Sequence, residues 1–337
     1  MSKFALNVLE KRVYPFTVAR DADVILGATF GEDVALTQVG DEILVSHVDP
    51  IVGAIGDIGW LAVHVACNDI ATSGVRPRWA LLLVLVPKKE DEELLEQIMR
   101  QADHAAREID VSIIGGHSGY SSGINRPLVA VTALGTTKQS KTIRTQGAGV
   151  GDHVFVTKGA GLEGTAILAQ DFAGTAKKLG LSKEDLVEAR KLMKVVSVIP
   201  EALALAEEGV TAMHDVTRGG VIETLLEVAY LSNVGIETDA SQIPLPPIVS
   251  RFARAFKFDP LKMISSGSLV ATVPKDSVEK ASQTLKNAGV PFADAGRVVE
   301  GRGVRVIYKD RVAHYKDIHC EDDELARLWA INIPDKI

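Results

Sequence analysis

The N-terminal half of the chain alternates apolar strands with amphipathic helices. Branched side chains dominate Ile43–Val48, which is typical of a strand. Apolar residues then recur at helical spacing from Asp57, an expected N-cap, to about Ser73. Trp79–Val86 is apolar almost throughout, as in a strand that is covered on both faces. Three further elements complete this half: a helix from Asp91 to about Ala106, and strands at Val111–Ile114 and Leu128–Leu134.

The C-terminal half begins after a glycine-rich break at Gly147–Gly151, where we place a domain boundary. It too mixes strands with helices, and one helix opens with a capping box at Ser182 and Asp185. The other predicted elements are helices after Pro200, after Thr217 and at Ser277–Ala288, and strands at His153–Thr157, Leu269–Val273 and Val304–Tyr308. The pattern therefore predicts two domains of the α/β or α+β class, over residues 1–148 and 149–337.

Length, charge and cysteine content narrow the class of protein. With 337 residues the chain exceeds one ordinary core, in agreement with two domains. Its formal net charge of -7 gives no overall attraction to nucleic acid or to an anionic membrane. The two cysteines, Cys67 and Cys320, make no disulfide framework and no paired-cysteine zinc motif. No signal peptide and no membrane-spanning run is recognisable, so a cytoplasmic location is expected.

Carboxylates and glycines cluster in four short segments of the first predicted domain. These segments are Gly31–Ala35, Val48–Pro50, Gly56–Gly59 with the later pair Asn68-Asp69, and Gly115–Ser118. Magnesium prefers oxygen ligands, usually one or two carboxylates together with phosphate oxygens and water. Glycines after a strand let backbone N–H groups approach phosphate closely. Acids at strand ends and on one helix are the groups that a magnesium–phosphate site needs.

Ordinary structural explanations exist for most of these segments. The first fits a surface turn at least as well, and Pro50 makes the second a good start for a turn. The glycine pair of the fourth is typical of a loop, and its histidine of a hydrogen-bonded structural residue. Asn68-Asp69 is harder to explain in this way, because a buried acid among apolar neighbours needs a partner.

One polar segment of the second domain leads into a predicted helix. His214–Gly220 places two glycines at a helix N-terminus, which is a ready site for an anion. Asp215 is suited to act as a base or metal ligand, and Arg218 is suited to hold a phosphate. A capped helix entry with a solvated arginine explains the same residues equally well. The stretch Lys158–Gly164 resembles a phosphate-binding loop only loosely, and it fits neither the Walker nor the dinucleotide pattern.

Taken in order, these segments resemble the superfamily of aminoimidazole ribonucleotide (AIR) synthase, PurM. That superfamily includes HypE, selenophosphate synthetase and thiamine-monophosphate kinase, and the chain is most similar to the hydrogenase maturation protein HypE. The motifs that carry the resemblance are Gly56–Val63, Asn68–Pro77, Asp215–Val221, Asp259–Leu261 and Ser266–Val270. The likeness spans roughly residues 30 to 310, and the ordered set is far more specific than any one motif.

The resemblance implies a PurM-like fold with ATP and Mg²⁺ as cofactors. Its N-terminal domain is expected to form a dimer through its sheet, and its C-terminal α/β domain to close a nucleotide cleft. By family analogy, Asp33, Asp49 and Asp69 hold magnesium and the ATP phosphates, with Asn68 beside them. The resemblance therefore implies that the acids of the first domain form one site.

Further site residues are implied on both sides of the same cleft. Gly115, Gly116 and His117 match the loop that lines it, and His117 is a candidate catalytic residue. The segment that faces them from the second domain contributes the catalytic candidates Asp215 and Arg218 and the cofactor-binding glycines Gly219 and Gly220.

The chain departs from the family pattern towards both ends. HypE carries its substrate on a C-terminal cysteine, whereas this chain ends with Asn332–Ile337 and its last cysteine is Cys320. The glycine-rich segment that several members fold over ATP is missing, since Gly27 is the one glycine among residues 1–30. Glu32 stands where the family commonly has an aspartate. The substrate is therefore not expected to be a cysteine carried on this tail.

Three functions are consistent with this pattern. The leading hypothesis is an ATP- and Mg²⁺-dependent enzyme that phosphorylates an amide, carbonyl or similar oxygen of an unidentified substrate. The first alternative is a hydrogenase maturation factor of HypE type, which implies contact with other maturation proteins. The second alternative is a non-catalytic nucleotide-binding dimer. ATP and a second copy of the chain are the expected partners, and neither nucleic acid nor a membrane is expected.

Overall fold

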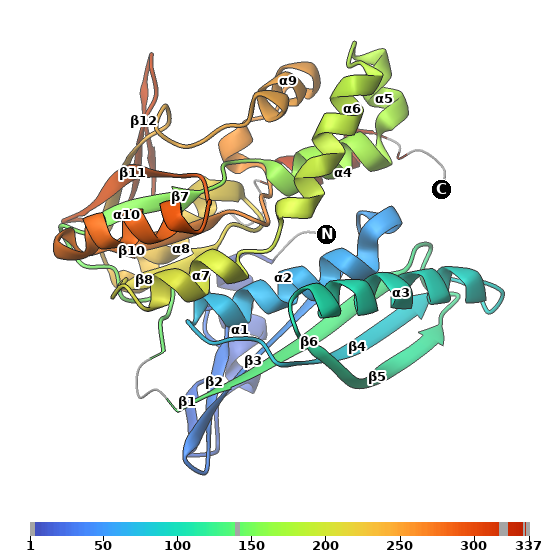
Figure 1. Ribbon diagram of the computed structural model, residues 1–337, viewed down its shortest axis with the longest axis horizontal. Helices are drawn as coiled ribbons and strands as arrows, with labels where there is room; N and C mark the ends of the chain where they lie inside the picture. The colour runs from blue at the N-terminus through green and yellow to red at the C-terminus, as the bar shows by residue number, and fades with distance from the viewer. Residues whose placement is uncertain (1–3, 139–141, 317–322, 333, 335–337) are drawn as a thin grey trace.

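Two mixed β-sheets organise the chain, one in each half (Figure 1). The computed structural model describes residues 4–138, 142–316, 323–332 and 334. The last strand of the first sheet ends at Thr137, and the first strand of the second sheet begins at His153. The domain boundary predicted between residues 148 and 149 lies in the connection between these two strands.

The first sheet has the strand order β1-β2-β3-β6-β4-β5. Its strands are β1 (Val24–Leu26), β2 (Ala35–Val39), β3 (Glu42–Ile51), β4 (Trp79–Val86), β5 (Ser112–Tyr120) and β6 (Leu128–Thr137). β4 and β5 are parallel, so the chain between them must cross over, and it does so through α3 (Glu92–Glu108). Helices α2 (Ile58–Thr72) and α3 lie together on one face of this sheet (Figure 1).

The other face of the first sheet is not covered within the described residues. Burial alternates along β4, where Leu82 and Val84 are buried whereas Leu81 and Leu83 are each 37% exposed. Val48 of β3 lies on the same face as Leu81, because both are register partners of Thr132. We call the side chains of Val48, Leu81 and Leu83 the open face. The prediction that β4 is covered on both sides is wrong for the single chain.

The second sheet has the strand order β13-β12-β9-β11-β7-β10-β8. Its strands are β7 (His153–Thr157), β8 (Ala212–Asp215), β9 (Gly235–Asp239), β10 (Leu269–Val273), β11 (Phe292–Val299), β12 (Gly303–Ile307) and β13 (Val312–Tyr315). Helices α7 (Ile199–Ala206) and α10 (Val278–Asn287) pack on one face. Helix α8 (Gly220–Ser232) packs on the other.

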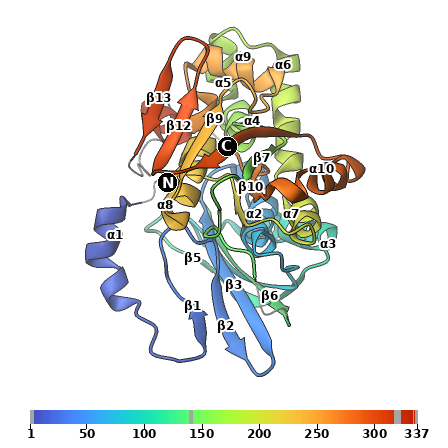
Figure 2. The same cartoon turned by 90° about the vertical axis from the view of Figure 1, so that its left-hand side faces the viewer.

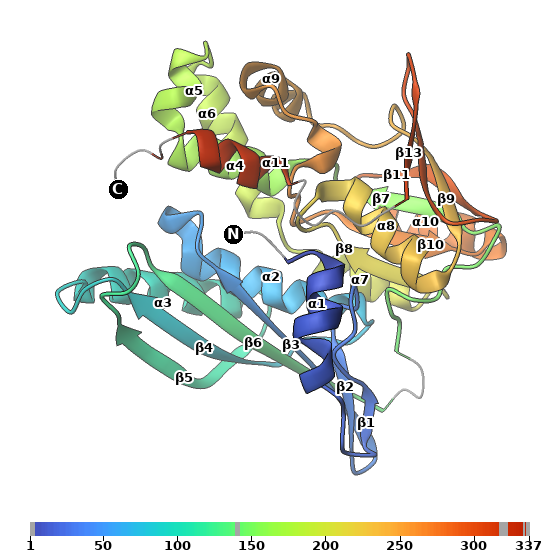
Figure 3. The ribbon, with the colours of Figure 1, turned by 180° about the vertical axis from the view of Figure 1, so that it is seen from behind.

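A group of helices extends the second domain over one end of α2 (Figure 3). It consists of α4 (Leu162–Asp171), α5 (Ala173–Lys178), α6 (Lys183–Arg190), α9 (Pro247–Phe256) and α11 (Glu324–Ile331). These helices share one apolar cluster, which also contains Leu61 and Val65 of α2. The short helix α1 (Leu6–Arg12) lies beside the body of the protein and contributes no buried residue to the described part of the chain (Figure 2).

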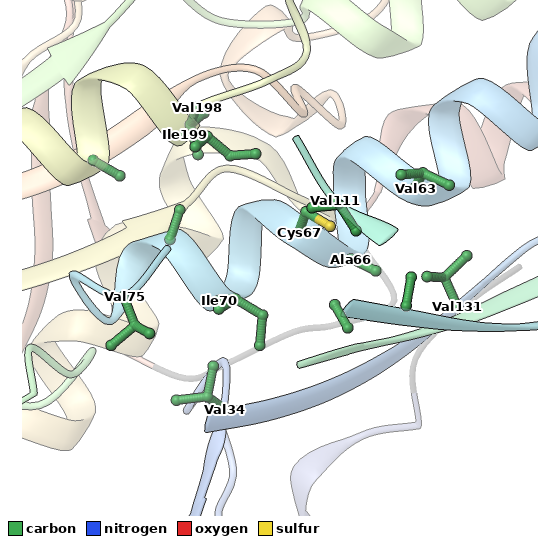
Figure 4. Packing of buried hydrophobic residues seen from close by; sticks show 14 of the residues in the cluster. Val34, Val63, Ala66, Cys67, Ile70, Val75, Val111, Val131, Val198 and Ile199 are labelled. Carbon is green, nitrogen blue, oxygen red and sulfur yellow. The ribbon is translucent and has the colours of Figure 1, made fainter. Parts of the chain in front are cut away.

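Helix α2 is shared by the two domains. All of its residues except Trp60 are buried. Its residues Ala66 and Ile70 belong to the same apolar cluster as the first sheet, and Val198 and Ile199 of the second domain extend that cluster from the opposite side (Figure 4). A helix that is apolar all round belongs in the middle of a structure. α2 therefore joins the two domains through one continuous core.

Several local predictions are confirmed and others are wrong. Ser182 forms the predicted capping box with Asp185, and proline occupies the first turn of α7. Asp57 makes no side-chain cap on α2, because its carboxylate accepts a hydrogen bond from Gln170 of α4 at 3.1 Å. The helix predicted to begin at Thr217 or a neighbouring residue is α8, with Gly219 at its N-cap position and a φ of 75°. Among the described residues, no helix combines the length and the apolarity that crossing a membrane requires.

Candidate active site

A cleft between the two domains gathers many of the polar residues that the sequence singled out. α2 and the end of β3 line it from the first domain, and α4, the segment before α8 and α11 line it from the second. Its volume is about 220 Å³, and it is partly open to solvent, as a site for a small-molecule ligand must be. Along α2 the lining changes from Asp69 to Val65 and Leu61. One end of the cleft is therefore acidic, and the other is apolar.

His214 lies at the centre of the acidic end. Its Nδ1 atom is 3.0 Å from a carboxylate oxygen of Asp33 and 3.7 Å from one of Asp215, and its Nε2 atom is 2.9 Å from Glu227. All four side chains are buried. Thr72 of α2 donates a hydrogen bond to the second oxygen of Asp33 at 2.9 Å. The loop before β2, together with β8 and α8, thus brings three carboxylates around one imidazole.

A second imidazole, that of His47 on β3, extends this cluster. Its Nε2 atom is 3.4 Å from Asp69, and its Nδ1 atom contacts the backbone carbonyl of Asp33. Asp69 and Asp49 also line the cleft. Asp49 belongs to the same strand as His47, two residues further on, so both side chains project from the same face of β3.

Like charges perturb the titration of this cluster. Burial raises the pKa of Asp69 well above its usual range, and the carboxylates of Asp215, Asp33 and Asp49 raise it further. Burial likewise raises the pKa of Asp215, with a contribution from Asp33. Burial opposes ionisation of His214, but Asp33, Asp215 and Glu227 outweigh it and raise the pKa of the imidazole well above its usual value. His214 is therefore a buried cation, and it neutralises only part of the surrounding negative charge.

The donor set fits a hard divalent cation. Ligand atoms of Asp33, His214 and Asp215 all lie within 4.8 Å of one another. Neither carboxylate oxygen of Asp215 accepts a hydrogen bond from the described residues, although Asp215 is fully buried. A buried carboxylate in that state is costly unless a cation or proton compensates it. The oxygens of Asp33, Asp69 and Asp215 are the atoms of this cluster that suit magnesium, which prefers carboxylate oxygen.

The residues predicted from the acidic segments are largely brought together. Asp33, Asp49, Asp69 and Arg218 line the cleft, and Asp215 is buried beside His214. They come from separate elements of both domains, so the fold places them in one site. Their roles towards a metal or nucleotide are taken up under the proposed function.

Gly115, Gly116 and His117 do not line the cleft of this chain. They lie inside β5 instead of forming a loop after it, because the strand continues to Tyr120. His117 pairs in register with Leu83 of β4, so it projects from the open face, away from the cleft. Gly116 packs closely on β4, where an added Cβ would lie 1.9 Å from the carbonyl oxygen of Leu82. This contact gives Gly116 a structural reason to be glycine.

Asn68 has a structural role in place of the predicted cofactor contact. Its side chain is fully buried, and its amide nitrogen donates to the carbonyl of Val196 at 2.7 Å. Its amide oxygen accepts the N–H of Val198 at 2.8 Å. Asn68 therefore clamps the segment before α7 against α2, and it holds the two domains together.

The glycines before α8 also differ from the expected anion site. The N–H of Gly219 donates to the carboxylate of Asp323 at 3.0 Å, and the N–H of Gly220 bonds to the carbonyl of Thr217. Both backbone donors are thus engaged within the chain. An added Cβ at Gly220 would lie 2.5 Å from the carbonyl oxygen of Leu261, so close packing requires glycine at this position.

Glu32 ties the acidic loop to the connection between the domains. Its carboxylate accepts the backbone N–H groups of Thr145 and Gln146, both at 3.2 Å. Burial raises its pKa, although these two hydrogen bonds counteract the shift. The glutamate that stands in place of the usual family aspartate therefore binds backbone of the interdomain connection.

Several residues of the cleft were missed by the sequence analysis. Glu163 is 3% exposed, burial raises its pKa to about 7, and Ser266 and Arg218 act in the opposite direction. Its only signal was its place in the loosely phosphate-like stretch 158–164. His47 and Glu227 lie inside ordinary strand and helix patterns, and Trp329 belongs to a helix that we did not predict. No local motif marks these three.

Cys67 does not line the cleft. Cys67 is buried in α2, and burial raises the pKa of its thiol to about 12, so it is protonated and unreactive at neutral pH. Cys320 lies outside the described residues.

Family comparison decides what kind of protein has this arrangement. A family model described as AIR synthase related protein, N-terminal domain, matches residues 31–137, and its C-terminal counterpart matches residues 149–309. The chain belongs to the AIR synthase related protein family. The resemblance found in the sequence is thereby confirmed, as is the two-domain PurM-like fold.

Relatives of this AIR synthase related protein include hydrogenase maturation proteins. It is 31% identical over 266 residues to a protein of Methanocaldococcus jannaschii named for hydrogenase expression and formation, covering 76% of this chain and 75% of that protein. It is 29% identical over 259 residues to the carbamoyl dehydratase HypE of Bradyrhizobium diazoefficiens, covering 75% and 72% of the two chains.

Solved structures of the same fold come from several proteins. A HypE–HypF complex aligns with a TM-score of 0.75 at 20% identity, over 92% of this chain and 99% of the other. HypE in complex with ATP aligns with a TM-score of 0.70 at 23% identity, over 85% and 87%. AaThiL complexed with AMPPCP and TMP aligns with a TM-score of 0.69 at 19% identity, over 86% and 90%. At these identities the likeness establishes the fold.

Proposed function

We propose that this AIR synthase related protein is an ATP- and Mg²⁺-dependent enzyme that phosphorylates an amide, carbonyl or similar oxygen of a second substrate. The observation that carries the proposal is the convergence of three buried carboxylates at one end of the cleft, where Asp33 and Asp215 contact His214 and Asp69 contacts His47. Such a cluster suits chemistry in which a metal and fixed positive groups compensate the charge of a transferring phosphoryl group. A cytoplasmic location and the absence of nucleic acid and membrane partners, expected from the sequence, belong to the same proposal.

Each residue of the acidic end has a role in this proposal. Asp33, Asp49 and Asp69 would hold the metal, which would neutralise phosphate charge, and Asp215 would complete the set of carboxylates. His214 keeps the side chains of Asp33, Asp215 and Glu227 in place as their common ion-pair partner. Arg218 lines the same cleft and is a permanent cation, so it is suited to bind a phosphate.

Relatives support ATP as the nucleotide. HypE and AaThiL share the fold of this chain, and they have been solved with ATP and with AMPPCP respectively. A more distant relative, 24% identical over 320 residues, is the selenide, water dikinase of Carboxydothermus hydrogenoformans. The ATP and AMPPCP were found bound to the first two of these relatives. They favour ATP for this chain because its acidic cluster lies in the part of the sequence that the family models match.

We further propose that the protein is a homodimer formed through the open face. Val48 is 60% exposed there, and Leu81 and Leu83 are each 37% exposed. Apolar side chains side by side on a sheet favour a partner that removes them from water. A second copy would cover this face and would bury the edge residue His117 in the same interface.

A HypE-type maturation factor is the second candidate. The similarity to the carbamoyl dehydratase HypE and the likeness to the HypE–HypF complex favour it. This candidate predicts that the chain binds another maturation protein, whereas the leading proposal requires ATP and a small acceptor alone. A binding measurement with the HypF of the same organism separates the two.

The proposed function is tested by calorimetric titration of ATP with and without Mg²⁺. We expect magnesium-dependent binding by the native protein and slow release of phosphate. Asp69→Ala should weaken magnesium-dependent binding at least about tenfold, because it removes a carboxylate at the centre of the cluster. Asp103→Ala, which alters an exposed acid of α3, is the matched control and should bind as the native protein does.

Two results would contradict this proposal. Unchanged ATP binding by a folded Asp69→Ala variant would overturn the metal assignment. Failure of the native protein to bind ATP at millimolar concentration would favour the non-catalytic dimer.

A further inference from the structure

The apolar end of the cleft lies beyond the groups assigned to metal and phosphate. Asp69, Val65 and Leu61 line the cleft from α2 at intervals of four residues. Two helical turns separate the first from the last, which is about 12 Å along the helix axis. A ligand at the apolar end is therefore adjacent to the acidic end without overlapping it.

Helix α11 builds the outer wall of this end. Leu325, Ala326 and Trp329 line the cleft from it. The indole of Trp329 stands edge-on against Phe172, the residue between α4 and α5, with ring centres 5.0 Å apart. From the first domain, the guanidinium of Arg126 lies 5.2 Å from the centre of the indole. The indole is thus held by groups from both domains, and it presents a fixed aromatic surface.

The start of α11 is anchored next to the acidic end. Asp323 caps the helix by accepting the N–H of Ala326 at 3.0 Å, and its other oxygen accepts the N–H of Gly219. Glu324 accepts the N–H of Asp259, and Arg327 donates to the carbonyl of Lys257. These contacts fix the helix against the second domain, so Trp329 has a defined position in the cleft.

Glu163 supplies a polar group to the same wall. It occupies the first turn of α4, one turn before Ile167, and both residues line the cleft. Ser266 donates a hydrogen bond to its carboxylate, whereas its Oε2 atom has no partner among the described residues. A buried hydrogen-bond acceptor without a partner is unfavourable, because it has lost water and gained nothing in return. A ligand that donates a hydrogen bond to it would remove this cost.

α11 lies outside the residues that the family models match, and this indicates which ligand binds at the apolar end. The models end at residue 309, so they include the acidic end and exclude α11. HypE and AaThiL bind ATP or its analogue, and AaThiL was solved with TMP as well. A wall that lies outside the shared part of the family suits the ligand that differs between members, which is the second substrate.

We infer that the apolar end of the cleft binds the second substrate, a neutral molecule with an apolar body and an N–H or O–H donor for Glu163. The apolar body would lie against Trp329, Ile167 and Leu61. This inference rests on the proposed function, because ATP bound at the acidic end leaves the apolar end for the substrate that is phosphorylated. A site built to receive a hydrogen bond rejects an analogue that lacks the donor.

Titration with benzamide tests the inference. Benzamide has an aromatic body and an amide N–H donor, and methyl benzoate has a similar body without a donor. We expect the native protein to bind benzamide in the millimolar range without nucleotide, and methyl benzoate at least about tenfold more weakly. Trp329→Ala should weaken benzamide binding about tenfold, and Trp329→Phe should retain most of it. Ile331→Ala, on the same helix but 69% exposed, should bind as the native protein does.

A variant of the acceptor group completes the test. Glu163→Leu should abolish the preference for benzamide over methyl benzoate, because the hydrogen-bond acceptor is gone while the apolar wall remains. Lack of benzamide binding by the native protein, or equal binding of both ligands, would overturn the inference. Displacement of benzamide by adenosine would assign the apolar end to the nucleobase instead. These titrations contain no ATP, so their result is separable from any failure of the proposed ATP binding.

Discussion

At the residue scale, the cleft gathers ionisable side chains at buried positions, where water does not solvate their charges. Asp33, Asp69 and Asp215 are each at most 8% exposed, and His214 is the buried cation among them. One imidazolium leaves an excess of negative charge whenever two or more of these carboxylates ionise. Under the proposed function, binding of magnesium to these carboxylates would therefore release protons from the cluster.

Glu163 allows a pH prediction at the same scale. Burial raises its pKa from 4.5 to about 7 in the folded protein. The folded state therefore holds the proton more tightly, and stability that is complete below about pH 4.5 is lost as pH rises through 7. The shift corresponds to on the order of 3 kcal/mol. Relative to the native protein, Glu163→Gln should become progressively more stable between pH 5 and pH 8.

Denaturant unfolding across that pH range measures this effect. Glu90→Gln, which alters an exposed carboxylate, should follow the native protein at every pH. A constant difference in the free energy of unfolding between Glu163→Gln and the native protein would show that Glu163 does not titrate in this window.

Individual site residues could be predicted only where a motif marks them. Asp33 lies just after a glycine, Asp49 ends a predicted strand, and Asp69 interrupts an apolar helix. All three carboxylates line the cleft. Asn68 carries the same kind of signal, yet its amide bonds to Val196 and Val198. A buried polar residue needs a partner, but sequence does not say whether that partner is a ligand or backbone from another domain.

At the scale of elements, periodicity predicted the strands and helices of the first domain well. It predicted less well which faces of these elements are covered. The run at Trp79–Val86 is a strand, but an apolar sequence does not reveal whether its second face meets a helix or a second chain. β5 extends through a glycine pair that is typical of a loop, because pairing with β4 favours extended backbone there. α11 is as short as α6 and α7, and it was missed because we recognised no start signal for it, whereas a capping box marks α6 and a proline marks α7.

The clamp between α2 and the segment before α7 gives a prediction at the element scale. Asn68→Ala leaves the carbonyl of Val196 and the N–H of Val198 buried without partners. Each such group costs about 1–3 kcal/mol, so for the two groups we expect a loss of about 2–6 kcal/mol in the free energy of unfolding. Denaturant titration measures the loss.

A matched control is available for this substitution. Asn287→Ala removes an exposed amide at the end of α10 and should change stability by less than about 0.5 kcal/mol. An effect of Asn68→Ala as small as that of the control would show that the clamp contributes little. A large loss of ATP affinity without loss of stability would instead restore Asn68 to the nucleotide site.

At the scale of the whole molecule, the two proposals concern two different surfaces of the chain. The cleft offers uncompensated negative charge to a cation, and the open face offers apolar side chains to another sheet. They lie on opposite sides of the first sheet, since Asp49 and Val48 are neighbours on β3 and point to opposite faces. Ligand binding and self-association are therefore compatible in one molecule.

Self-association is predicted to depend on Leu83. Leu83→Glu places a charge in the middle of the open face, where a second copy would have to desolvate it. We expect a dimer for the native protein and a monomer for this variant in sedimentation velocity at micromolar concentration. Val187→Glu changes an exposed apolar residue of α6 and should remain dimeric. A native monomer, or a dimeric Leu83→Glu variant, would exclude this face as the interface.

The shared helix α2 also limits how this protein is able to diverge. Its residues other than Trp60 are buried, and Gly59 lies so close to α3 that an added Cβ would be 2.2 Å from the carbonyl oxygen of Ile98. Neutral evolution needs positions where a substitution costs little stability, and α2 has almost no such position. α11 is different, because residues such as Ile331 are exposed. New specificity is therefore expected to accumulate on α11, while α2 changes slowest of all the helices that line the cleft.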